Sequence, residues 1–90
     1  MSRIVYLECR EDNHNKFYLM TEDPTGTTFV ARWGRIGTEG SFCMYSISYW
    51  HKKLHERLSH GYVDRTQDYL GQQPRLNRLA GYRRGLRGNP

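Results

Sequence analysis

The sequence predicts an α+β fold: a small twisted antiparallel sheet of four to five strands, one helix packed across one face, and a basic C-terminal tail. Three observations predict it. Stretches rich in β-forming residues alternate with short polar or glycine-containing turns, a single stretch of helical spacing follows them, and arginine is concentrated at the end. A chain of 90 residues forms one small domain with a modest core.

Four stretches of β-branched, aromatic and aliphatic residues predict strands. They cover residues 3–10, 16–21, 27–33 and 41–45. In the second stretch, Phe17 and Leu19 fall on one face of the strand, and Tyr18 and Met20 fall on the other.

Turn-forming residues separate these strands. Residues 11–15 are polar, and residues 22–26 contain Pro24 and Gly26, which suit a tight turn because proline fixes φ and glycine accepts positive φ. Residues 34–40 hold three glycines and predict the third turn.

One helix is expected after the fourth strand, with Ser46 or Ser48 as its cap and Gly61 at its end. The side chains spaced to pack on the sheet are Ile47, Trp50, Leu54 and Leu58. Those expected largely on the outer side are Lys52, Lys53, Glu56 and Arg57. Trp50 is expected in the core, and Tyr62-Val63 adds a short last strand.

The chain divides into a body, residues 1–65, and a basic tail, residues 66–90, and charge is distributed unevenly along it. Residues 1–64 carry eight Lys and Arg against eight Asp and Glu, whereas residues 65–90 carry six Arg against Asp68 alone. The tail is expected to be largely disordered, because it cannot bury enough surface to offset its ordering entropy. Its candidate phosphate contacts are Arg75, Arg78, Arg83, Arg84 and Arg87. The alternative is a solvated tail that maintains solubility.

Several classes of protein are disfavoured. No apolar run approaches the ~20 residues of a membrane span, and no secretory signal is visible, so we expect a cytoplasmic protein. Cys9 and Cys43 are therefore expected as buried free thiols.

Catalytic and metal-site patterns are absent from the sequence. His51 and His55 share a helix face, but the spacing of a zinc site is missing, and the glycines of residues 34–40 lack the G-K-[ST] of a phosphate-binding loop. No pair of a nucleophile and a general base can be recognised in the sequence. We expect no enzymatic activity, no metal and no cofactor.

Residues 29–40 are the main candidate for a binding element. Trp33 lies between Arg32 and Arg35 at the end of a strand, and a flat ring with two guanidinium groups suits a sugar–phosphate backbone. The alternative is that Trp33 is a hydrophobic plug and that Arg35 braces Glu39.

A resemblance supports the binding interpretation. Trp33-Gly34-Arg35-Ile36-Gly37 followed by Gly40, together with Asn15-Lys16-Phe17-Tyr18 and Gly61-Tyr62, resembles the WGR domain over roughly residues 3–65. Family members are small sheet-plus-helix modules of bacterial proteins and of DNA-dependent poly(ADP-ribose) polymerases, where the module grips DNA near a break. The chain departs from the family in the helical part: its stretch before Gly61 is shorter, and Ser41 replaces the usual Gln.

The resemblance implies a non-enzymatic module that contacts DNA backbone or ends with little sequence preference. By motif, Trp33 would stack on a sugar or exposed base, and Arg35 would pair with phosphate or with the carboxylate of a neighbouring domain. The other implied contact residues are Arg32, Lys16, Gly34 and Gly37. The alternative function is a protein–protein interaction adapter. A monomer is expected in either case.

Overall fold

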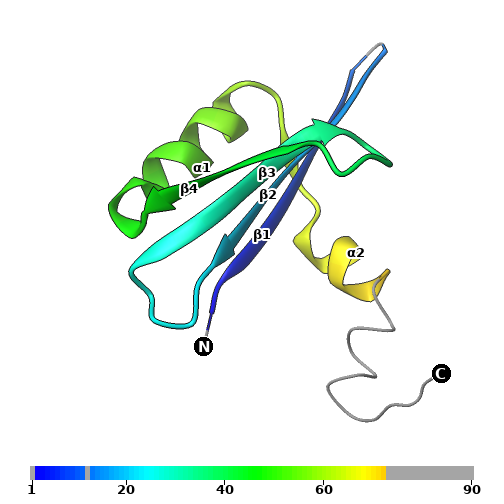
Figure 1. The fold of residues 1–90 in the computed structure, drawn as a ribbon. Coiled ribbons are helices and arrows are strands. Elements are labelled where there is room, and N and C mark those ends of the chain that lie inside the picture. The colour runs from blue at the N-terminus through cyan, green and yellow to red at the C-terminus, as the bar shows by residue number, and fades with distance from the viewer. Residues whose placement is uncertain (1, 12, 73–90) are drawn as a thin grey trace, which may run out of the picture.

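The chain forms a five-stranded antiparallel sheet with the strand order β4-β3-β2-β1-β5 (Figure 1). The computed structural model describes residues 2–11 and 13–72. The strands are β1 (Ile4–Glu11), β2 (His14–Glu22), β3 (Thr28–Arg35), β4 (Ser41–Ser46) and β5 (Val63–Asp64). The predicted α+β class and antiparallel sheet are confirmed.

Three helical segments follow the first four strands: η1 (Ile47–Tyr49), α1 (Trp50–Ser59) and α2 (Thr66–Gly71). The Ser46 hydroxyl accepts a hydrogen bond from the Ser48 N–H at 3.3 Å, so the predicted cap residue begins the 3-10 turn and α1 starts four residues later. Gly61, at φ 90°, follows the end of α1, as predicted. Helix α1 covers one face of the sheet, and α2 lies on the other (Figure 1).

The core lies between α1 and the sheet. Its buried residues are Leu7, Tyr18, Met20, Phe29, Ala31 and Trp50. The register explains this set, because Leu7, Tyr18 and Trp33 face one another across three strands, and directly opposed residues share a face. Trp50 is 2% exposed and meets the Phe29 ring edge-on at 5.2 Å between centroids, which confirms the prediction that it is core.

Strand β3 continues further than predicted. It runs through Trp33, Gly34 and Arg35, because all three pair with β2, which itself begins at His14. The Ile36 N–H then donates to the Asn15 carbonyl at 2.8 Å. The third turn is therefore confined to residues 36–40, and the Trp-Gly-Arg sequence occupies a strand instead of a turn.

Two predicted burials are wrong. Cys43 is exposed, whereas Cys9 is buried as expected, and both thiols are free. Cys43 lies on β4, which in the described part of the chain has a neighbouring strand on one side only, so less of its side chain is covered. Leu58 is 44% exposed, because Arg57 occupies the position at the end of α1 that faces the sheet.

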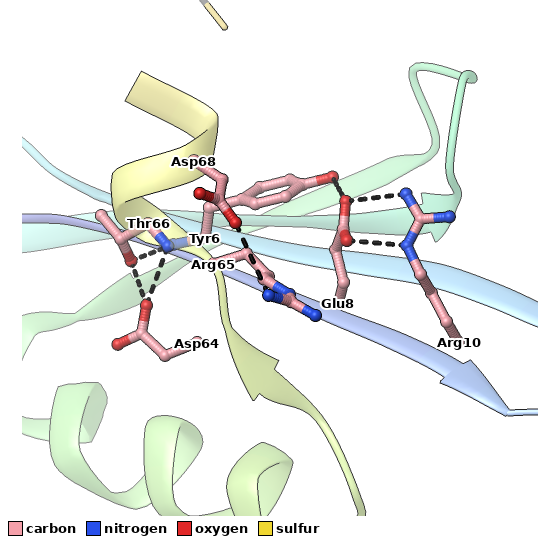
Figure 2. A network of polar contacts seen from close by, with 7 residues as sticks. All are labelled: Tyr6, Glu8, Arg10, Asp64, Arg65, Thr66 and Asp68. Carbon is pink, nitrogen blue, oxygen red and sulfur yellow. Dashed lines mark hydrogen bonds and ion pairs between the residues drawn. The ribbon is translucent and has the colours of Figure 1, made fainter. Parts of the chain in front are cut away.

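A polar network (Figure 2) and a ring stack hold α2 against β1. The Tyr6 N–H donates to the Thr66 hydroxyl at 3.0 Å, the Arg65 N–H donates to the Tyr6 carbonyl at 2.8 Å, and the rings of Tyr6 and Tyr69 stack at 4.5 Å. The Tyr6 hydroxyl also donates to Glu8 at 2.9 Å. Helix α2 thus follows directly on the predicted boundary at residue 65, while the five predicted tail arginines lie outside the described residues.

Candidate nucleic-acid interface

A cavity of about 340 Å³ opens where β3 ends, beside the last turn of α1. It is lined by three basic side chains, two aromatic rings, two amides and one glycine. These are Lys16, Arg35, Arg57, Trp33, Tyr62, Asn13, Asn15 and Gly34. Among residues 2–11 and 13–72, no Asp or Glu belongs to this lining, although residues 1–64 are neutral as a whole. The fold therefore concentrates positive charge at one aromatic-walled hollow.

Trp33 forms a wall of this cavity and is also part of the packing. Its ring stacks on Tyr18, with 6.2 Å between centroids and 26° between planes, and it packs against the buried core cluster. The side chain is half-buried, so one part of the ring is held by the core and the rest reaches the cavity. Trp33 therefore contributes both to the hydrophobic packing and to the wall of the cavity.

Arg57 enters the cavity from α1. Its guanidinium carbon lies 4.5 Å from the centroid of Tyr18 and 5.9 Å from that of Tyr62, which is cation–π geometry. Its Nε atom is buried and has no hydrogen-bond partner within the described residues. Burial raises the pKa of Tyr18, and the neighbouring Arg57 charge partly offsets that rise. A buried donor without a partner carries a desolvation cost, which the stacking on Tyr18 offsets in part.

Lys16 and Arg35 lie directly opposite each other on β2 and β3, and both are exposed. Like charges in opposed positions of a sheet repel, and an anion between them would relieve this repulsion. The backbone at Arg35 is fixed, because its carbonyl accepts the Thr38 N–H at 3.0 Å and the Thr38 hydroxyl at 2.7 Å. The structure records no ion pair between Arg35 and Glu39, both of which it describes.

Gly34 has a steric role in this region. A Cβ atom at Gly34 would lie 2.8 Å from the Cα of Gly40, and a Cβ atom at Gly40, which has φ 69°, would collide with the Trp33 carbonyl. The two glycines allow the chain to return against the end of β3. Gly34 therefore supports the cavity wall through the close backbone approach that it permits.

The structure separates the six predicted body residues into two groups. Lys16, Trp33, Gly34 and Arg35 line the cavity together. Arg32 and Gly37 line a different hollow of about 270 Å³, on the sheet face that carries α2, with Tyr6 and Tyr69. Arg32 is on that face because side chains alternate along a strand, so the Arg32 side chain points to the face opposite Trp33.

Four lining residues were not predicted as contacts: Asn13, Asn15, Tyr62 and Arg57. Asn15 and Tyr62 belong to the motifs that carry the family resemblance, which was the available signal. Arg57 had a signal in the helical spacing. It follows Trp50 by seven residues and Leu54 by three, which places it on the stripe that faces the sheet.

A family model for the WGR domain matches residues 2–69 of the chain. The chain belongs to the WGR domain family. WGR domains are nucleic-acid-binding modules in poly(ADP-ribose) polymerase-type proteins and are typically non-catalytic. Comparison with curated proteins and with solved structures gives no match.

The WGR match ends within α2, so the family region includes the start of that helix as well as the whole sheet. In residues 2–11 and 13–72, no group of three or more His, Cys, Asp and Glu side chains is placed to hold a metal ion. None of the helices in these residues is long and apolar enough to cross a membrane.

Proposed function

We propose that this WGR domain binds the sugar–phosphate backbone of DNA, at ends or nicks, through the cavity beside Trp33. The observation that carries the proposal is the composition of the cavity lining: three cationic side chains and two aromatic rings, with no carboxylate among the described residues. Such a set matches a phosphate flanked by a sugar or base face.

Each group has a part in this proposal. Arg35 and Lys16, exposed at the rim, contact phosphate oxygens and relieve their mutual repulsion. Arg57 adds a third positive charge from α1. The exposed part of Trp33 stacks on a sugar or a base. Because phosphates and ring faces occur in every sequence, the expected sequence preference is small.

The test is a comparison of two neighbouring arginines. Binding of fluorescently labelled blunt, nicked and single-stranded DNA is measured by anisotropy at several salt concentrations, for Arg35→Gln and Arg32→Gln. The two variants remove the same charge from the same strand, but on opposite faces. We expect Arg35→Gln to weaken binding about tenfold and to reduce the salt slope by about one phosphate contact, and Arg32→Gln to change it far less. Equal losses, or no binding at low salt, would overturn the proposal.

We propose that the tail arginines add nonspecific phosphate contacts to this interface. A variant that ends at Gln72 keeps α2 and removes Arg75, Arg78, Arg83, Arg84 and Arg87. It is expected to bind all DNA forms more weakly and to keep its preference among them. Complete loss of binding would show that the cavity does not bind DNA by itself.

The second candidate function is a protein–protein adapter. The observation that favours it is the exposure of Phe42 and Met44, at 71% and 64%, on the sheet face opposite α1. Absence of DNA binding in the full chain at low salt, together with capture of one defined protein that Phe42→Lys abolishes, would support this function instead.

A further inference from the structure

The outer edge of β4 is open for pairing. β4 stands at the end of the strand order, and in the part of the chain that the structure describes no strand lies beyond it. Its sequence, Ser-Phe-Cys-Met-Tyr-Ser, contains no charged residue and no proline, the features with which edge strands usually prevent association. Ser41, Phe42, Cys43 and Met44 are all exposed. Among the described residues, nothing covers this edge, and neither a charge nor a proline protects it.

The direction of the backbone groups on this edge follows from one hydrogen bond. The Ile47 N–H donates to the Thr27 carbonyl at 2.9 Å, so the backbone of Ile47 points toward β3. Backbone groups of successive residues alternate in direction along an antiparallel strand. The N–H and C=O groups of Cys43 and Tyr45 therefore also point toward β3, and those of Phe42 and Met44 point outward.

This arrangement is self-complementary under a two-fold axis. If Phe42 of one copy opposes Met44 of another, the same pairing recurs across the axis, and the outward-pointing groups of Phe42 and Met44 meet their counterparts. The apposed side chains are the two exposed apolar ones, and contact between methionine sulfur and an aromatic ring is favourable. No like charges oppose each other within the paired strands.

We propose that β4 pairs antiparallel with β4 of a second copy of this chain, with Phe42 opposite Met44 and Cys43 at the two-fold axis, so that one sheet continues through both copies. The two Cys43 residues then form a non-hydrogen-bonded pair with about 4.5 Å between Cα atoms. This interface involves none of the basic side chains of the cavity, so it stands independently of DNA binding. It replaces the monomer expected from the sequence.

The area involved predicts a weak dimer. At about 200 Å² for each fully exposed side chain, the exposed parts of Phe42 and Met44 amount to roughly 270 Å² per copy and about 540 Å² per dimer. Stable interfaces bury about 1,200–2,000 Å² in total. The paired backbone adds to the area buried by these side chains but does not bring the total to that of a stable interface. We therefore expect dimerisation to depend on protein concentration in the micromolar to millimolar range.

The first test is sedimentation of the full chain, under reducing conditions, over this concentration range. We expect the apparent mass to rise toward that of a dimer. Phe42→Lys, which places a charge beside its symmetry mate, is expected to remain monomeric. Leu58→Lys is the matched control, because it adds the same charge at another exposed apolar site, on α1. A full chain that remains monomeric at the highest concentration, or equal effects of the two variants, would overturn the proposal.

The second test reads the register through thiol crosslinking. In a Cys9→Ala background, diamide removes two electrons and two protons from a pair of Cys43 thiols to form the disulfide, for which about 4.5 Å between Cα atoms is suitable. The control, Cys9→Ala with Cys43→Ser and Ser41→Cys, moves the thiol to a position about 13 Å from its symmetry mate. Rapid crosslinking of Cys43 and slow crosslinking of the control are expected.

Equal crosslinking rates would mean random collision and would reject this register. A third comparison uses a variant that ends at Gln72. If that variant dimerises and the full chain does not, residues 73–90 occupy the edge or face of β4, and the proposal fails for the full chain.

Discussion

The guanidinium carbon of Arg57 lies 4.5 Å from the centroid of the Tyr18 ring, and Tyr18 is 1% exposed. A residue at the end of α1 is thus joined to the centre of the sheet, and the same residue lines the basic cavity. The stability of the fold and the positive charge of the candidate site therefore share one side chain.

Replacement of Arg57 separates these two contributions. Arg57→Met keeps an unbranched side chain over Tyr18 but loses the charge, so we expect about 1 kcal/mol loss of stability. DNA binding should fall about tenfold, with a salt slope lower by about one. Arg57→Lys keeps the charge without the planar group and should fall between Met and the wild type in binding. Urea unfolding and anisotropy measure the two effects, and unchanged binding by Arg57→Met would place Arg57 outside the interface.

Two glycines of the turn after β3 are expected to differ in sensitivity. A Cβ at Gly40 would collide with the Trp33 carbonyl, and its φ is 69°, so Gly40→Ala should cost about 3 kcal/mol or more. Gly37 has φ 96° with open space around the added atom, so Gly37→Ala should cost only about 1–2 kcal/mol of backbone strain. Chemical denaturation of both variants measures the difference. Similar midpoints would contradict the close approach of residue 40 to β3.

The carboxylate of Glu8 should contribute pH-dependent stability. Hydrogen bonding from the Arg10 guanidinium, at 2.9 Å, and from the Tyr6 hydroxyl lowers the pKa of Glu8. A lowered pKa in the folded state means that the contribution is complete above the ordinary value of about 4.3 and is lost as pH falls through the folded value. Glu8→Gln should therefore cost about 1–2 kcal/mol at pH 7 and much less near pH 2–3.

Unfolding free energies of Glu8→Gln and the wild type from pH 7 to pH 2 check this dependence. Glu39→Gln serves as the control, because Glu39 is an exposed carboxylate with no ion pair among the described residues. A Glu8→Gln deficit that stays constant with pH would refute the electrostatic origin.

Helix α2 is expected to belong to the folded domain. A variant that ends at residue 65, the predicted boundary, removes Tyr69 from its stack on Tyr6 and uncovers the hollow beside Phe17. We expect it to be less stable than a variant that ends at Gln72, by about 1–3 kcal/mol. Tyr69→Ala in the full chain should reproduce much of this loss. Thermal unfolding of the three variants measures it, and equal stability would support the boundary at residue 65.

The strands and the core could be predicted because alternation and turn residues are local signals. Tyr18 and Met20 were placed on one face of β2, and both are buried there. The end of β3 was predicted too early, because glycine at position 34 indicates a turn by itself, whereas its pairing with Phe17 depends on a distant strand. Such pairing is set by register and is not written in the local sequence.

The candidate site was predicted in part for the same reason. Trp33, Arg35 and Lys16 were found through the family motif and do lie together. Arg32 was grouped with them by sequence proximity, although strand alternation alone places it on the opposite face. Arg57 comes from a different element, α1, and only its spacing from Trp50 and Leu54 indicates that it faces the sheet.

The stacked position of Arg57 has a consequence for the thermodynamics of recognition. A guanidinium already stacked on Tyr18 and close to Tyr62 loses little rotational freedom when a ligand arrives, whereas the exposed side chain of Arg35 must be immobilised on contact. The two arginines carry equal formal charge but would lose different amounts of side-chain conformational entropy on binding. The part of the cavity lined by Arg57 is therefore preorganised, and the part lined by Arg35 is adaptable.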